Sequence, residues 1–198
     1  MRVLALSPHT DDADLGAGGT LARWAEEGRE VWTVAFSTAM RSELEDEFRA
    51  AADTLGIQPG NVIVYNFPHH IFPSQRQAIL QHMIALRDKL QPDLVLGPSL
   101  RDVHQDHWTV ANEMLRAFKM ASILSYELPW NNLNFETLVF AKLNREHLDQ
   151  KLKALRCYQG QRLKTYFNED FIEGLARTRG TQIQTTYAEA FEVIRWIL

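Results

Sequence analysis

The chain alternates short apolar runs with segments of helical periodicity, and this alternation limits its fold more than any other feature. Runs such as 3–6 and 94–96 are apolar throughout, which is typical of strands buried on both faces of a parallel sheet. Between these runs, apolar residues recur every three or four positions, as in helices that cover a sheet. Repeated strand–helix units favour right-handed crossovers. We therefore predict a doubly wound α/β fold, a three-layer sandwich with a mostly parallel central sheet.

The limits of the elements follow from local signals. Ser42 and Glu45 have the spacing of a capping box, and Ser74 is a suitable N-cap for the next helix. The strands predicted in this way are 3–6, 31–36, 62–67, 94–97 and 123–126. The last third is less regular, with a strand near 138–141, a helix through 148–155 and a late strand over 190–194. No repeat or flexible linker interrupts the chain, so we expect one domain spanning residues 1–198.

Composition narrows the classes of partner and compartment. The formal net charge of −4 comes from interspersed acids and bases, so the chain has no broad basic surface for nucleic acid or anionic membranes. Cys157 is the only cysteine, which suits a reducing compartment, and we expect a cytoplasmic protein. No apolar run has the length of a signal-peptide core or a membrane span, so no membrane insertion is expected. The oligomeric state stays open, a homo-oligomer included.

Two polar clusters follow strands of the predicted sheet. Residues 7–14 come directly after the first strand, and residues 102–107 come shortly after the fourth. Ligands of open parallel sheets bind beyond the carboxyl ends of the strands, so both clusters lie where sites form. Each cluster combines histidine with carboxylate, the ligand types that zinc and similar metals favour. Together they can supply three ligands and leave a fourth position for water.

Each cluster also has an ordinary explanation when it is taken alone. A His–Asp pair in a loop is commonly a turn with a solvated histidine. Asp11 and Asp12 are suitable residues for a helix N-terminus. His104 and His107 are spaced as an exposed pair on one helical face. The metal hypothesis rests on the coincidence of both clusters at strand ends.

These motifs resemble those of a known family. His9-x-Asp11-Asp12, followed by Leu15-Gly16 and Gly18-Gly19-Thr20, is similar to the first motif of the PIG-L/LmbE-like zinc-dependent N-acetyl-sugar deacetylases. The segment His104-x-Asp106-His107 is similar to their second motif. Weaker similarities around 49–56, 153–161 and 187–191 extend the resemblance almost to the C-terminus.

The resemblance implies a Rossmann-like fold and hydrolysis of the N-acetyl group of an amino sugar or N-acetylglucosaminyl conjugate, with release of acetate. The partner would be that small-molecule conjugate. Carried over by position, the residues that would hold one zinc ion, or another divalent metal, are His9, Asp12 and His107.

The resemblance also suggests roles for three further residues. Asp11 would be the general base that takes a proton from the attacking water. His104 would either stabilise the oxyanion or protonate the leaving amine. Asp106 would orient a neighbouring histidine. Spacing alone does not distinguish Asp11 from Asp12.

The chain departs from the family pattern at a few positions. Thr10 and Gln105 stand where the family often has proline, Asp14 stands where glutamate is usual, and Gly160 replaces a common serine. None of these changes removes an expected ligand or the expected base.

The glycines of the first motif, Gly16, Gly18 and Gly19, have two interpretations. They could cradle a phosphate, as in dinucleotide-binding turns, or let a helix pack closely behind the metal loop. The second strand ends without an acidic residue to hold a ribose, and the neighbouring acidic residues would repel a pyrophosphate. We therefore favour close packing.

Further polar and aromatic residues follow the predicted strands. Arg41 could bind a substrate anion, and residues after the fifth strand could hold a sugar ring. The candidates for substrate binding are Arg41, Glu127, Trp130, Asn131 and Tyr187. An ordinary surface arginine and a loop packed on the core are the alternatives. His69 and His70 are expected to be a polar loop pair. The resemblance implies that Tyr187 and Glu189 close the far side of the site, and the alternative is that they only anchor the last strand.

Two other functions remain open from the sequence. His/Asp loops also build phosphoesterase sites, for which two metals would be expected. A non-catalytic sugar- or nucleotide-binding module is the third hypothesis, and the intact Asp11 and His104 argue against it.

Overall fold

A computed structural model describes residues 1–198 and contains one seven-stranded sheet in the order β3-β2-β1-β4-β5-β7-β6. The strands β1 to β5 are parallel, and β7 runs antiparallel to both of its neighbours, β5 and β6. The strands are β1 Arg2–His9, β2 Glu30–Ser37, β3 Val62–Val64, β4 Leu94–Gly97, β5 Ser122–Tyr126, β6 Val139–Leu143 and β7 Tyr187–Arg195. The predicted mostly parallel sheet is confirmed.

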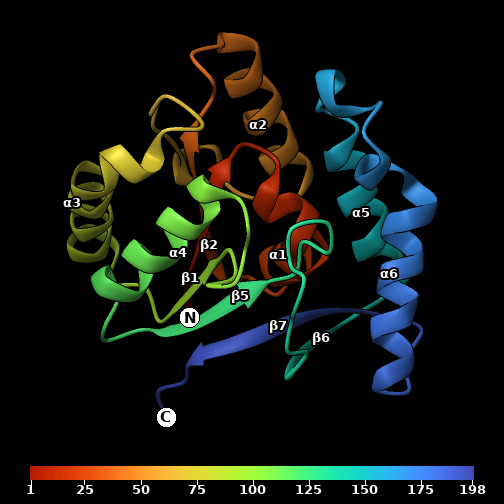
Figure 1. Cartoon of the computed structure of the whole chain (residues 1–198). Helices are drawn as coiled ribbons and strands as arrows, with labels where there is room; N and C mark the ends of the chain where they lie inside the picture. Colours follow the sequence, from red (N-terminus) through yellow and green to blue (C-terminus); the bar gives the residue numbers. More distant parts are fainter.

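Helices cover both faces of the sheet, which makes the predicted three-layer sandwich (Figure 1). The helices are α1 Asp12–Glu26, α2 Ser42–Thr54, α3 Phe72–Leu90, α4 Gln105–Ala117, α5 Arg145–Leu155 and α6 Glu169–Gln182. Helices α3 and α4 pack on one face, and α1, α2, α5 and α6 lie on the other. Short 3-10 turns occupy Pro59–Asn61, Gln159–Gln161 and Thr165–Phe167.

The central strand β1 shows how the apolar pattern becomes a core. Successive side chains of a strand point to opposite faces, so a strand between two helix layers must be apolar on both. Leu4 and Leu6 pack in the core beneath α3 and α4, whereas Val3 and Ala5 belong to the core on the other face. All four side chains are fully buried.

The order of the strands reverses between β1 and β4, which pair with each other directly. The crossovers from these two strands therefore leave toward opposite faces, and the loops after them separate to form a crevice. The first polar cluster follows β1 and the second follows β4, so both clusters border this crevice.

Two of the predicted helix starts are wrong in detail. Ser42 and Glu45 do not form a capping box, because α2 begins at Ser42 and its N-cap, Arg41, makes no side-chain capping bond. Helix α3 begins at Phe72, before Ser74, whose hydroxyl donates to the carbonyl of Ile71. At the start of α3, the backbone N–H of Phe72 donates instead to Oδ1 of Asp106 at 3.1 Å, a contact that local spacing does not reveal.

The C-terminal third contains one element that the sequence did not predict, the helix α6. Its buried residues, Ile172, Ala176 and Gly180, are few and mostly small, so its apolar periodicity is weak. The predicted late strand 190–194 lies within the longer β7, and the predicted helix through 148–155 lies within α5. No helix of the chain has both the length and the apolar character needed to span a bilayer.

Candidate metal centre

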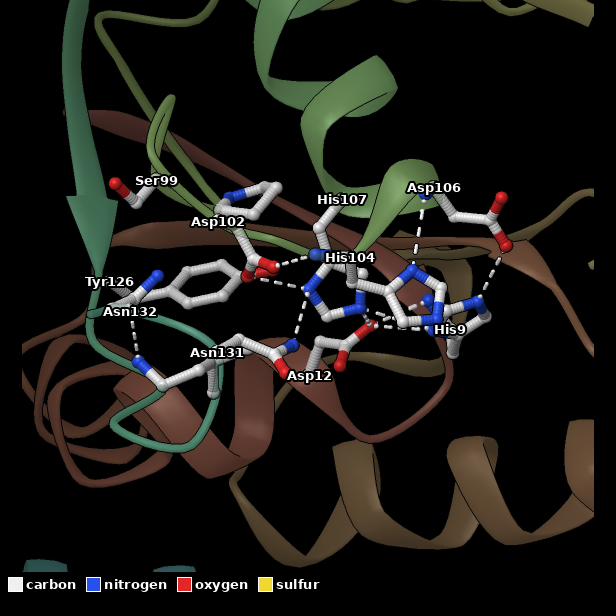
Figure 2. Close-up of polar contacts among 12 residues, drawn as sticks. His9, Asp12, Ser99, Asp102, His104, Asp106, His107, Tyr126, Asn131 and Asn132 are labelled. Atoms are coloured by element: carbon white, nitrogen blue, oxygen red, sulfur yellow. Dashed lines mark hydrogen bonds and ion pairs between the residues drawn. The ribbon is translucent and has the colours of Figure 1, made fainter. Parts of the chain in front are cut away.

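Three side chains from the two polar clusters meet at the crevice (Figure 2). His9 ends β1, Asp12 begins α1, and His107 lies in the first turn of α4. Nδ1 of His9 is 3.3 Å from Oδ2 of Asp12 and 3.2 Å from Nε2 of His107. Nε2 of His107 is 3.3 Å from the same Asp12 oxygen. Residues almost 100 positions apart thus place three donor atoms in a nearly equilateral triangle.

This triangle fits a divalent metal ion. Zinc binds imidazole nitrogen and carboxylate oxygen at about 2.0 to 2.2 Å, and the edges of such a tetrahedron are therefore about 3.3 to 3.6 Å. The three separations lie at or close to this range. Three protein ligands with a fourth position open is the arrangement found in catalytic rather than structural zinc sites.

Two further carboxylates orient the imidazole rings. Asp102 Oδ2 lies 2.8 Å from Nδ1 of His107, and Asp106 Oδ2 lies 3.1 Å from Nε2 of His9. A carboxylate accepts the ring N–H, so each contact places a proton on the nitrogen outside the triangle and leaves a lone pair on the nitrogen inside it. Asp106 thus orients His9, as expected for a neighbouring histidine.

The carboxylates around the triangle attract positive charge, which in the metal-free protein is carried by protonated His9 and His107. Although burial raises the pKa of Asp12, the neighbouring His107 and His9 hold it well below its usual range, so this carboxyl stays ionised. Burial lowers the pKa of His107, but Asp12 and Asp102 raise it to about 10. His9 likewise has a pKa raised to about 9 against burial, by hydrogen bonds to Asp106 and Asp12. The site has the negative charge that a metal requires.

Asp11 lies beside the triangle and has a different environment. It lines the same cavity, and its carboxylate makes no helix-capping bond and no ion pair with another side chain. Burial and the neighbouring charge of Asp12 raise its pKa to about 6. Asp12 and Asp11 therefore differ in chemistry. Asp12 is ionised and contacts both histidines, whereas Asp11 can exchange a proton near neutral pH.

His104 is oriented by the helix that it caps. The backbone N–H of Asp106 donates to Nδ1 of His104 at 3.1 Å, so Nδ1 is an acceptor. Burial and the charge of His107 lower the pKa of His104 to about 4. The ring is therefore neutral at pH 7 with its proton on Nε2, and that N–H is a hydrogen-bond donor beside the metal triangle.

The triangle opens into a cavity of about 480 Å³. Besides the residues above, the lining that bears on function is Arg41, Trp130, Asn131, Gln161, Lys164 and Tyr166. The rings of Trp130 and Tyr166 stack with their centroids 4.2 Å apart, which joins the loop after β5 to the turn at Thr165–Phe167. A second cavity of about 520 Å³ lies elsewhere, near Asp93 and Ser122, and has no histidine in its lining.

Two of the predicted substrate-binding residues do not line this cavity. Glu127 is buried in an ion pair with Arg179. The hydroxyl of Tyr187 contacts Arg177 at 3.0 Å and Arg145 at 3.2 Å, away from the triangle. Position after a strand suggested Glu127 and the family resemblance suggested Tyr187, but both side chains contact arginines of α6. Glu127 and Tyr187 therefore lie outside the lining of the cavity that contains the triangle.

Glu189 anchors the last strand and does not close the site. Its carboxylate accepts from the backbone N–H groups of Gly19 and Thr20 at 3.0 and 2.7 Å and forms a buried ion pair with Lys151 at 2.6 Å. These hydrogen bonds hold the strand β7 against the middle of α1.

The glycines of the first motif provide close packing, as expected. A Cβ atom on Gly16 would lie 2.5 Å from Cδ2 of Tyr126, and one on Gly19 would lie 2.5 Å from Cδ1 of Leu143. A Cβ atom on Gly18 would lie 3.0 Å from Cγ of Lys151. Larger residues would push α1 away from the sheet and displace the metal loop at its N-terminus.

Asp102 has a role that the motifs do not indicate. This residue is within the second polar cluster, but the family motif begins at His104 and gives Asp102 no function. Its Oδ1 accepts the backbone N–H of His104 at 2.8 Å while its Oδ2 contacts His107. An acidic residue five positions before a candidate ligand was the only signal available.

Comparison with protein families gives a match over residues 4–118 to the family described as GlcNAc-PI de-N-acetylase, PIG-L. The matched region contains both polar clusters and covers more than half of the chain. The chain belongs to the PIG-L family. The family resemblance stated from the motifs is thereby confirmed.

Similar proteins agree with this membership. An uncharacterized deacetylase of Escherichia coli K12, YaiS, is 28% identical over 165 residues, which cover 78% of this chain and 88% of the relative. N,N'-diacetylchitobiose deacetylase from Pyrococcus horikoshii superposes with a TM-score of 0.80 at 21% identity, covering 98% of this chain and 83% of that one. GalB of Pseudomonas putida KT2440, a 4-carboxy-2-hydroxymuconate hydratase, superposes with a TM-score of 0.83 at 20% identity, covering 100% and 97%.

The family is described as a de-N-acetylase, which is a hydrolase acting on amides, and this chain is an enzyme of that class. The similarity to a hydratase shows that the fold alone does not determine the reaction.

Proposed function

We propose that this chain, acting as a single domain over residues 1–198, hydrolyses the N-acetyl group of an amino sugar or N-acetylglucosaminyl conjugate and releases acetate. His9, Asp12 and His107 would hold one zinc ion per chain. The observation that carries the proposal is the position of Asp11, a carboxylate without an ion-pair partner that lines the same cavity as the metal triangle.

Amide hydrolysis needs help at three points. Water must lose a proton, negative charge must be stabilised on the carbonyl oxygen, and the leaving amine must gain a proton. A bound zinc ion acidifies water and polarises the carbonyl group. The side chains around the triangle are suited to the remaining proton transfers.

Asp11 is the proton carrier in this proposal. Its carboxylate accepts a proton from the attacking water and then delivers it to the nitrogen of the departing amine, so no proton is left over. A pKa raised to about 6 by burial and by Asp12 suits both transfers near neutral pH. Such a base contributes roughly 10² to 10⁴ in rate.

His104 is the hydrogen-bond donor to the oxyanion. Because its Nδ1 accepts from the backbone N–H of Asp106, the neutral ring carries its proton on Nε2. A neutral donor can stabilise the negative charge without giving up the proton. Of the two roles that the family resemblance left open, this tautomer favours stabilisation of the oxyanion over protonation of the amine.

The walls of the cavity suit a sugar with a further substituent. The stacked rings of Trp130 and Tyr166 offer an apolar wall, and Asn131 and Gln161 offer amide groups for hydroxyls. Arg41 and Lys164 add positive charge at the rim.

The test combines metal analysis with an acetate-release assay on N-acetylglucosaminyl conjugates. The wild type should contain about one zinc per chain and release acetate. His107→Ala should lose the metal, and Asp11→Asn should keep the metal while turnover falls at least about 100-fold. Asp88→Asn, an exposed residue paired with Arg87 outside the cavity, is the matched control and should behave as wild type.

An Asp11→Asn variant with normal turnover would contradict the assignment of the base. The assay should include a simple aryl phosphate ester in parallel. Release of phosphate with two bound metals, and no release of acetate, would support the phosphoesterase hypothesis instead.

A further inference from the structure

A second group of potential metal ligands lies at the mouth of the same cavity. His70, His104 and Asp106 each have a ligand atom within 4.8 Å of the ligand atoms of the other two. The rings of His70 and His104 have their centroids 5.7 Å apart and are inclined by only 31°. His70 comes from the loop before α3, whereas His104 and Asp106 come from the start of α4. The function proposed above makes no use of His70.

The backbone of His70 is held in an unfavourable conformation. Its φ angle is 65°, in the left-handed region that residues other than glycine rarely adopt. The N–H of His70 donates to Oδ2 of Asp106 at 2.6 Å, and its carbonyl accepts from the side chain of Gln105. The loop is thus tied to α4 at both backbone groups of His70, and the imidazole is kept beside His104.

The hydrogen bond from Gln105 to the carbonyl of His70 depends on a residue that departs from the family pattern. Proline is frequent at this position in the family, and proline has no side-chain donor that could reach the carbonyl of His70. The departure from the family pattern therefore coincides with the one contact that fixes the carbonyl side of the loop.

His104 is the residue that links this group to the catalytic site. It also belongs to a group with His9 and His107, whose ligand atoms lie within 4.8 Å of one another. Its Nδ1 already accepts a hydrogen bond from the backbone of Asp106, so Nε2 is the nitrogen free to bind a cation. A cation on Nε2 would displace the proton with which His104 is proposed to stabilise the oxyanion.

We propose that His70 and His104 form a second, weaker site for a divalent cation that prefers imidazole, such as zinc, and that occupation of this site inhibits hydrolysis. Imidazole favours zinc, copper and nickel over magnesium and calcium. The site is weaker than the triangle because Asp106 adds negative charge beside the cation but does not bind it as a third ligand. Both Asp106 oxygens already accept hydrogen bonds, from His70 and His9 on Oδ2 and from Phe72 on Oδ1.

Binding is tested without substrate, so this part does not depend on the proposed function. The metal-free protein is dialysed against increasing zinc, and bound metal is counted. The wild type should bind a first equivalent tightly and a second more weakly. In His70→Asn the second equivalent should bind at least about tenfold more weakly, while the first is unchanged. Asparagine is chosen because it tolerates the left-handed backbone but lacks the imidazole.

The neighbouring His69→Asn is the matched control. His69 is exposed in the same loop, with its ring centroid 4.3 Å from that of His70, but it is not part of the ligand group. It should keep the second equivalent. A wild type that binds only one zinc would overturn the proposal, and so would a second equivalent that survives in His70→Asn or is lost equally in His69→Asn.

Inhibition is the part that rests on the proposed function, and it is measured as a ratio within each variant. Acetate release at excess zinc is divided by release at one equivalent. The ratio should fall well below one in the wild type and in His69→Asn, and it should stay near one in His70→Asn. A second equivalent that binds yet raises the rate would refute inhibition. If the first equivalent binds but no acetate is released, the proposed substrate fails while the binding result stands.

Discussion

Oδ2 of Asp102 lies 2.8 Å from Nδ1 of His107, and the contact is fully buried. It selects the tautomer of His107 that presents a lone pair to the metal triangle, and it holds the ring in that orientation. Removing such a partner of a metal-binding histidine typically lowers metal affinity by about 10- to 100-fold. We therefore expect Asp102→Ala to weaken zinc binding by this factor, measured by competition with a chromophoric chelator.

Asp102→Asn separates orientation from charge. The amide oxygen can still accept the N–H of His107, so this variant should lose less affinity than Asp102→Ala. An Asp102→Ala protein that binds zinc as the wild type does would show that the contact is structural only. Asp93→Ala, which removes a carboxylate bonded to the backbone N–H of Arg2 outside the metal cavity, is the control.

Metal binding should release protons at neutral pH. In the metal-free protein the pKa of His9 is raised to about 9 and that of His107 to about 10, because neighbouring carboxylates outweigh burial. A metal needs the lone pairs of His9 Nδ1 and His107 Nε2, so the bound state holds fewer protons. Linkage then requires zinc affinity to rise with pH from 7 toward 9.

Calorimetry in buffers of different ionisation enthalpy measures this release directly. At pH 7 the apparent enthalpy of zinc binding should depend on the buffer with a slope of at least about one proton per zinc. A binding enthalpy that is the same in all buffers would mean that both triangle nitrogens are already free of protons. Affinity that falls as the pH rises would contradict the sign of the argument.

The sequence predicted the parts of the fold that depend on local periodicity. Strands buried on both faces, such as β1 and β4, are apolar throughout, so their position and the crevice beyond them follow from the sequence. Helix α6 was not predicted, because it packs against β7 through small residues and has no apolar stripe. The insertion of β7 between β5 and β6 is a long-range pairing with no local signal.

The residues of the site also divide into those that the sequence indicated and those whose contacts only the fold reveals. Ligand types at strand ends are visible in the sequence and pointed to the residues of the triangle, whereas only the family resemblance distinguished Asp11 from Asp12. The partners of Glu127 and Tyr187 were not visible, since Arg179 and Arg177 come from the unpredicted α6. His70 was interpreted as a loop residue because its neighbour His104 is far away in the chain and is brought close only by the fold.

Gly16 should be intolerant of even the smallest side chain. A Cβ atom there would lie 2.5 Å from Cδ2 of Tyr126, whose ring is fully buried and whose hydroxyl donates to the carbonyl of Leu6. Overpacking of this kind costs about 1–3 kcal/mol, which exceeds the gain of about 1 kcal/mol from replacing glycine in a helix. Gly16→Ala should therefore lower the free energy of unfolding, measured with denaturant.

Gly174 is the matched control because it also lies within a helix but a Cβ atom there meets no atom within 4 Å. Gly174→Ala should raise the free energy of unfolding by about 0.5–1 kcal/mol. If both variants are stabilised, the close packing of α1 on Tyr126 does not limit residue 16.

Arg41 is the arginine of this chain whose side chain has no hydrogen bond or ion pair. Other arginines pair with carboxylates, as Arg49 does with Glu45, or bond to carbonyls, as Arg195 does to Phe118. Arg41 follows two residues with positive φ, Ala39 at 52° and Met40 at 60°, in a loop that lines the metal cavity. An unpaired guanidinium held by a strained loop at the rim suits a substrate that carries an anionic group.

The prediction compares two N-acetylglucosaminyl substrates that differ only by a carboxylate on the aglycone. Arg41→Met keeps the length of the side chain and removes the charge. It should lower kcat/KM for the anionic substrate by about tenfold, the value of one charge-assisted hydrogen bond, and leave kcat/KM for the neutral substrate nearly unchanged. Arg162→Met, in which the lost guanidinium bonds to the carbonyl of Arg156 outside the cavity lining, should affect neither substrate. Equal losses of kcat/KM on both substrates would mean that Arg41 maintains the loop and does not bind the anionic group of the substrate.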